Sequence, residues 1–170
     1  EINLFKRFLK VFELAYQRYL DIEKAEAQAR EAQIEASLER VRAVAMSMNK
    51  PDDLLNICEV SFNEFKKLGF DNLRNSLIHI LDDEKEFFLD YDFSDSTGGK
   101  ITNIFYKSHP IVENYLAQIR GAKDAFAEIV INGSQLNDWK DFRLKTGQQD
   151  DPRLNNIQAL YYYGYSIGVG

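Results

Sequence analysis

The sequence predicts an α+β protein in which a long N-terminal helix of coiled-coil type precedes an antiparallel sheet with flanking helices. The first 48 residues contain neither glycine nor proline. After them, segments of strand-like alternation are interleaved with amphipathic helical segments. A length of 170 residues provides for one ordinary domain and an appendage.

Composition narrows the class of protein. The net charge of -6 and the pI near 5.0 argue against a nucleic-acid surface, which needs clustered Lys and Arg. The single cysteine, Cys58, excludes an internal disulfide and suits a reducing compartment. No apolar run approaches the ~18 residues of a membrane span, and no signal peptide is visible. We therefore expect a cytoplasmic protein whose present segment makes no direct membrane contact.

Residues 1–50 are expected to form a helical linker. Apolar residues recur in it at spacings of three and four, which predicts a stripe along one side of a helix. The N-terminal part of this stripe comprises Phe5, Phe8, Phe12, Ala15, Tyr19 and Ile22, and the C-terminal part comprises Ile34, Leu38, Val41, Ala45 and Met48. Between these parts, residues 23–33 offer only alanine at the equivalent positions. Since a lone helix cannot bury its own stripe, we expect a homodimer through residues 34–48. A surface helix packed on its own domain is the alternative.

Residues 51–170 are expected to form the domain. Pro51 breaks the first helix, Asp52 and Asp53 favour a new helix N-terminus, and Gly69 is a suitable stop. Strands are predicted at 76–81, 87–93, 101–108, 125–131 and 157–169, with helices at 110–121 and 134–146, and with the run SDSTGG as a loop. These elements predict a single antiparallel sheet with helices beside it.

Two stretches carry a resemblance to a known family. AEAQAREAQIEASLERVRAVAMSM, followed by DDLLNICEVSFNEFKKLGF, resembles the signalling-helix linker and first helix of GAF-like sensory domains in large bacterial sensor histidine kinases. HPIVENYLAQIRG and YYYGYSIGVG continue the resemblance. It implies a GAF-like domain that is incomplete at its C-terminus. It also implies a non-catalytic module of a two-component signalling protein, which relays a conformational signal through a dimeric helix.

Residues 1–22 are similar to the terminal helix of a preceding copy of such a module. This similarity leaves two arrangements open for them. They either pair with the same segment of a second chain or fold back onto the domain, in place of its missing last helix.

The residues that could carry chemistry are few. His79 lies in a predicted strand and His109 at a loop-to-helix junction, so neither suits a phosphoacceptor. Cys58 lies on the apolar face of a helix, where a small buried side chain is the expected role. The acidic residues between Asp82 and Asp95 lack calcium-loop spacing and are interpreted as a solvated hairpin. We therefore predict no catalytic residue and no metal site.

A ligand pocket remains the main candidate site, because GAF-like folds hold small molecules between the sheet and its covering helices. Aromatic side chains that could line it are Tyr91, Phe105, Tyr106, Trp139 and Tyr162, with Tyr161 and Tyr163 beside them. The same residues could instead fill a core, which would make the chain a purely structural dimerisation spacer without a ligand. An enzyme whose site needs further regions is a third possibility. The residues do not identify a cofactor.

Overall fold

The computed structural model describes residues 1–121 and 124–167, and it has the predicted α+β order. Helix α1 (Ile2–Met46) leads through the short turn η1 (Pro51–Asp53) into α2 (Leu54–Lys67). Then come β1 (Ser76–Asp82), β2 (Phe87–Ser94), β3 (Gly98–Phe105), α3 (Pro110–Ile119), β4 (Phe126–Asn132), α4 (Ser134–Lys145), η2 (Pro152–Asn155) and β5 (Ala159–Tyr165). The predicted element types are confirmed, and β3 differs by starting at Gly98, inside the expected loop. Residues 168 and 169 of the predicted last strand lie outside the described residues.

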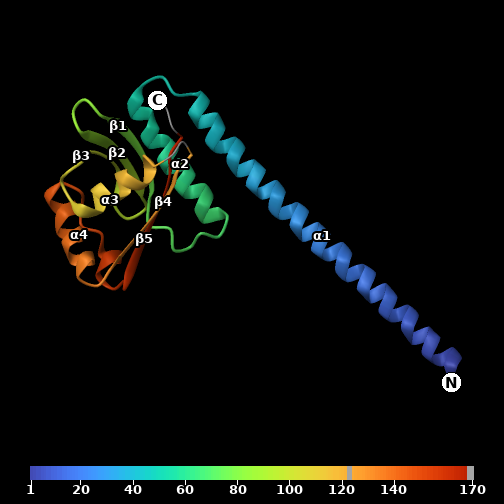
Figure 1. Cartoon of the computed structure of the whole chain (residues 1–170). Coiled ribbons are helices and arrows are strands. Elements are labelled where there is room, and N and C mark those ends of the chain that lie inside the picture. The colour runs from blue at the N-terminus through green and yellow to red at the C-terminus, as the bar shows by residue number, and fades with distance from the viewer. Residues whose placement is uncertain (122–123, 168–170) are drawn as a thin grey trace.

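Helix α1 projects far from the domain (Figure 1). Its 45 residues correspond to a length of about 67 Å at 1.5 Å per residue. Only its C-terminal part runs beside α2, and the N-terminus lies at the far tip (Figure 1). Residues 1–22 do not fold back onto the domain in this structure.

Helix α1 packs on α2 through a narrow stripe. Ile34, Val41, Val44 and Met48 are half-buried and Ser37 is buried, which marks one face of α1 by spacings of three and four. The Arg40 guanidinium donates to the Glu64 carboxylate at 2.6 Å. At the C-terminal cap of α2, Arg30 donates to the carbonyl oxygen of Leu68 at 2.7 Å. Both polar bonds therefore join α1 to the C-terminal end of α2.

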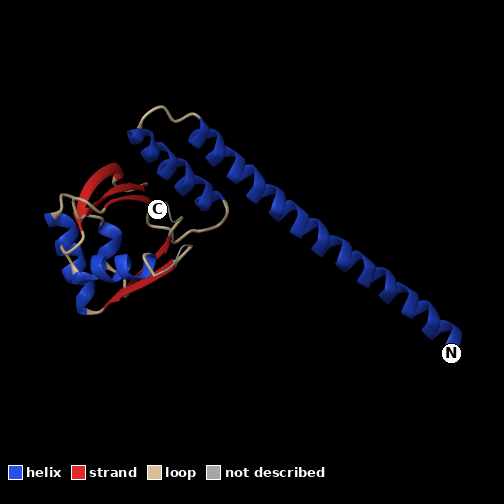
Figure 2. Cartoon of the chain, turned by 45° about the horizontal axis from the view of Figure 1, so that its top comes forward, coloured by secondary structure: helices blue, strands red, loops and turns tan. Residues whose placement is uncertain are grey.

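The strands form two separate sheets instead of the single predicted sheet (Figure 2). Strands β1, β2 and β3 make one antiparallel sheet with β2 in the centre, and β4 pairs antiparallel with β5 in the other. Tyr115 of α3 lies between them. Its hydroxyl is 2.9 Å from His79 Nδ1 on β1, and its ring lies so close to β5 that a Cβ on Gly164 would stand 2.8 Å from it. Its side chain therefore contacts both β1 and β5.

The core has a layer on each face of the three-stranded sheet. Helix α2 covers one face, where Cys58 and Phe62 are buried. Helices α3 and α4 cover the other, and their cluster contains Phe88, Ile104, Val112, Leu116, Ile119 and Ala127. A second cluster joins β4 to α4 through Ile129, Ile131 and Leu136. The three-stranded sheet is therefore enclosed on both sides.

The Arg40–Glu64 pair makes stability depend on pH. The hydrogen bond from Arg40 lowers the pKa of Glu64 to about 2 from an ordinary value of 4.5. Its stabilising contribution is therefore complete above pH ~4.5 and is lost as the pH falls towards 2. Because half of the Arg40 side chain is exposed, we expect a contribution of about 1 kcal/mol.

Urea unfolding at pH 6, 4 and 2.5 measures this contribution in the parent chain and in Glu64→Gln. The parent should lose about 1 kcal/mol more than the variant over this range, since other carboxylates titrate in both proteins. An identical loss in the two proteins would show that the pair contributes nothing.

Candidate functional site

A cavity of about 980 Å³ lies between the two sheets. Residues 77–81 of β1 and 162–167, which include the end of β5, form two of its walls. Both runs are consecutive, so the unpaired edges of β1 and β5 border the cavity (Figure 2). Helices α3 and α4 supply another wall, and β2 and the loop residues Arg74 and Gln148 also line the cavity. The residues of α3 and α4 are Ile111, Val112, Tyr115, Ile119, Trp139, Phe142 and Arg143. The volume is at the upper end of the ~300–1,000 Å³ range of small-molecule sites.

Strand alternation gives the cavity an apolar end and a polar end. Successive side chains of β2 point to opposite faces, so Phe88, Asp90 and Asp92 share the face towards the cavity. In the register of the sheet, Phe88 stands opposite Leu81 and Ile104, which builds the apolar end. Asp90 stands opposite His79 and Thr102 and begins the polar end.

A hydrogen-bonded chain crosses the polar end from α3 to β2. Tyr115 Oη is 2.9 Å from His79 Nδ1, and His79 Nε2 is 3.1 Å from an Asp90 oxygen. Burial, with the charge of Asp90, raises the pKa of Tyr115 to about 12, so its hydroxyl keeps its proton and can donate to His79. Gln148 donates to the second Asp90 oxygen at 2.9 Å. These partners hold the buried Asp90 carboxylate in place.

Arg74 forms a second polar group with the loop before β5. Its guanidinium donates to Tyr162 Oη at 3.1 Å and to an Asp151 oxygen at 3.5 Å. Arg153 bonds the same Asp151 carboxylate at 3.0 Å, and these bonds outweigh burial and lower its pKa to about 2. The Nε of Arg74 is buried and has no hydrogen-bond partner among the described residues. An unsatisfied buried donor of this kind costs about 1–3 kcal/mol.

Two further charges line the cavity without an ion pair between them. Arg143 of α4 is only 4% exposed, and burial, together with nearby Arg74, lowers its pKa. Burial raises the pKa of Asp92, and the like charge of Asp90 raises it further. Each charged form is therefore disfavoured by its surroundings, and each would gain from a group of opposite charge inside the cavity.

The arrangement is suited to binding. Cys58 lies on the α2 side of the sheet, where burial and the charges of Asp92 and Asp90 raise its thiol pKa to about 12, so it is not a ready nucleophile. The His109 ring accepts a hydrogen bond from the Ile111 amide at 3.1 Å and so caps α3. Within residues 1–121 and 124–167, no group of three His, Cys, Asp or Glu side chains is placed to hold a metal ion.

The predicted pocket residues have different surroundings. Trp139 and Tyr162 line the cavity, joined by a bond from the indole nitrogen to the phenol oxygen at 3.2 Å, and Tyr163 lies beside them. Tyr91 is buried on the α2 side. Phe105 is 59% exposed at the end of β3, and Tyr106 bonds Asp83 at 2.8 Å. These last three residues do not belong to the cavity wall.

The predicted dimer residues are likewise divided. Ile34, Val41 and Met48 face the α2 of their own chain, whereas Leu38 and Ala45 are exposed. The five residues lie on one helix face, but α2 covers the side of it that includes Ser37 and Val44, so Leu38 and Ala45 are left at the exposed edge.

Most polar residues of the cavity were not predicted as site residues. Asp90 and Asp92 alternate with Leu89, Tyr91 and Phe93, a pattern that ordinarily places carboxylates in solvent. Only the position of α3 and α4 over this face reveals its burial. Arg74, Arg143 and Gln148 come from a loop, a helix and another loop, and no local spacing connects them.

Comparisons with family models, with curated proteins and with solved structures found no match to this chain. The helices of the described residues include none that is both long and apolar enough to cross a membrane. What the site does therefore has to be argued from its geometry.

Proposed function

We propose that the chain is a non-catalytic sensory and relay module, GAF-like in fold, from a cytoplasmic two-component signalling protein of bacteria. One observation carries this proposal: the cavity connects to the long helix through a continuous series of packed elements. The series runs from the cavity to β2, from β2 to α2, and from α2 to α1. A small molecule in the cavity would contact β2 directly.

The first step of the series lies within β2. Asp90 and Tyr91 are consecutive and both buried, Asp90 on the cavity side and Tyr91 on the α2 side. The Cys58 thiol of α2 donates to the Tyr91 carbonyl oxygen at 3.3 Å. A displacement of β2 at Asp90 therefore reaches α2 without passing through any loop.

The second step joins α2 to α1. Glu64 is buried on α2 and receives bonds from Arg40 of α1 at 2.6 Å and from Lys67 at 2.7 Å. Small shifts or rotations of packed helices are a common means of signal transmission. Helix α1 would carry such a shift along its length to residues 2–22.

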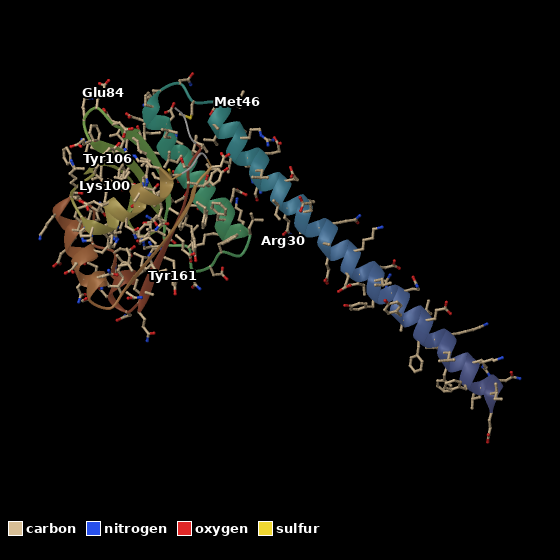
Figure 3. The ribbon with its side chains drawn as sticks, in the orientation of Figure 1. Arg30, Met46, Glu84, Lys100, Tyr106 and Tyr161 are labelled. Carbon is tan, nitrogen blue, oxygen red and sulfur yellow. The ribbon has the colours of Figure 1, made fainter. Side chains whose placement is uncertain are left out.

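The N-terminal half of α1 supports dimerisation of the module. Phe5 and Val41 are 36 positions apart, about ten turns at 3.6 residues per turn, so they point to the same side of a straight helix. Val41 faces α2, and the same face is left uncovered in residues 2–22, beyond the contact of Arg30 with α2 (Figure 3). The exposed residues of this N-terminal stripe are Ile2, Phe5, Phe8, Leu9, Phe12, Tyr16, Tyr19 and Leu20, with Leu4, Val11 and Ile22 along one edge.

The area of the stripe is that of a protein interface. Its five aromatic residues are each more than half exposed, and at ~150–250 Å² apiece they alone present on the order of 500 Å². The aliphatic residues bring the total close to the ~800 Å² that each partner contributes to a stable interface. The partner we propose is the same stripe of a second copy, since two such stripes are equally long and equally apolar. We therefore propose residues 2–22 as the dimer contact, in place of residues 34–48.

A spacer without a ligand is the second candidate function. The exposed stripe favours it, because dimerisation alone would explain residues 2–22. The buried charges of the cavity favour a sensor, because a structural core gains little from an unpaired Arg143 and Asp92.

Dimerisation can be tested by sedimentation. We expect the parent chain to be a dimer at about 50 μM, and Phe8→Glu with Phe12→Glu to make it a monomer while leaving the melting temperature of the domain unchanged. Lys10→Glu with Gln17→Glu, on the opposite side of α1, is the matched control and should stay dimeric. A monomeric parent chain would refute the proposed interface.

The relay can be tested by the distance between the two copies. A spin label on Gln28→Cys reports the separation of the paired helices, and Cys58 is too buried to be labelled. We expect Asp92→Asn, which removes a cavity charge, to shift the mean label distance by about 2 Å. Asp141→Asn, an exposed change on α4, should leave the distance unaltered. An unchanged distance in Asp92→Asn would favour the spacer.

A further inference from the structure

The polar end of the cavity contains a guanidinium and a carboxylate that lack partners of opposite charge. Arg143 uses its Nε to bond Gln148, and the described residues place no carboxylate oxygen within 4.0 Å of its guanidinium. Asp92 accepts one side-chain bond, from Asn75 at 2.8 Å, and makes no salt bridge with a described residue. Gln148 connects the two, because it accepts from Arg143 and donates to Asp90, which is two residues from Asp92 on the same face of β2. Arg143 and Asp92 therefore both lie at the polar end of the cavity wall without an ion pair between them.

The remaining charges at this end are balanced. Arg74 is committed to Tyr162 and Asp151, and Asp90 is committed to His79 and Gln148. A ligand that carried only a negative charge would meet two carboxylates, Asp90 and Asp92. A ligand that carried only a positive charge would meet two guanidiniums, Arg74 and Arg143. The favoured ligand has both charges close together.

We infer that the cavity binds a free α-amino acid with a large apolar or aromatic side chain. Its carboxylate would accept hydrogen bonds from Arg143, and its ammonium group would donate to Asp92. The ammonium and carboxylate groups of an α-amino acid are attached to one carbon. They therefore fit between Asp92 and Arg143, which lie at the same end of the cavity without an ion pair between them. Paired guanidinium–carboxylate bonds are the strong, directional kind that fixes an orientation.

The apolar end of the cavity receives the side chain. Phe88, Ile104 and Val112 line this end, and Tyr115 and Trp139 contribute aromatic rings to the same cavity. Aromatic rings pack favourably against such walls in edge or offset arrangements. The apolar and polar ends follow one another along β2, which matches an amino acid with its head and side chain at opposite ends.

This inference rests on the proposed sensory function, for which it names the class of ligand. It is tested by calorimetric titration of the full chain with L-phenylalanine, L-tryptophan and L-leucine. The same chain is titrated with 3-phenylpropionate, which lacks the ammonium group, and with 2-phenylethylamine, which lacks the carboxylate. We expect L-phenylalanine to bind at least ten-fold more tightly than either of the latter two.

Variants assign the two charges. Asp92→Asn should weaken the binding of L-phenylalanine at least ten-fold, while 3-phenylpropionate should bind at least as tightly as to the parent, because one like charge is removed. Arg143→Gln should weaken L-phenylalanine and leave 2-phenylethylamine nearly unchanged. Asp141→Asn and Lys145→Gln, both exposed on α4, are the controls and should bind as the parent does. The comparison of analogues on the parent chain holds even where Arg143→Gln fails to fold.

The outcomes separate this inference from the function on which it rests. Equal affinity for L-phenylalanine and either analogue would overturn the amino-acid assignment and leave a sensor of another ligand. Absence of binding by all five compounds would also overturn it. The dimer and distance measurements would still decide the relay, because neither requires a ligand.

Discussion

The structure depends on burial of β2 on both faces. Most sheets of this size leave one face in water, and their central strands then alternate apolar and polar residues. Here the residues of β2 alternate in the same way, but α3 and α4 cover the polar face. Asp90 and Asp92 consequently lie in a cavity, where each carboxylate needs specific partners. Asp90 finds them in His79 and Gln148, whereas Asp92 has Asn75 alone. Strand β2 therefore contacts the cavity with one face and α2 with the other.

Burial of β2 on both faces also connects the cavity to helix α1. Tyr115 lies between the two sheets and bonds His79, so one side chain contacts both β5 and the polar end of the cavity. On the opposite face, α2 is packed on β2 and bonded to α1 through Glu64. The N-terminal stripe of α1 then continues the face that α2 covers. Two packed interfaces, β2 with α2 and α2 with α1, thus connect Asp90 and Asp92 to the paired helices, and no loop lies between them.

Local patterns were sufficient for the elements of the fold and insufficient for the site. The absence of glycine and proline before Pro51 predicted α1, and alternation in FFLDYDF predicted β2. The prediction of a single sheet was wrong: the strands form two sheets, and Tyr115, which is far from β1 and β5 in the sequence, lies between them. Arg74, Asp92 and Arg143 were missed because three different elements bring them together, and no spacing in the sequence expresses that. The stripe at residues 34–48 was assigned to a second chain because its period is the same whether the covering helix is α2 or a dimer partner.

The most direct test of this account is hydrogen exchange at individual amides in the parent chain and in Asp90→Asn. This substitution removes a charge on the cavity face of β2 and touches neither helix on the other side. We expect faster exchange in β2, in α2 and in residues 34–46 of α1. Faster exchange restricted to β1, β2 and α4, with α1 and α2 unchanged, would show that the cavity and the long helix are mechanically independent.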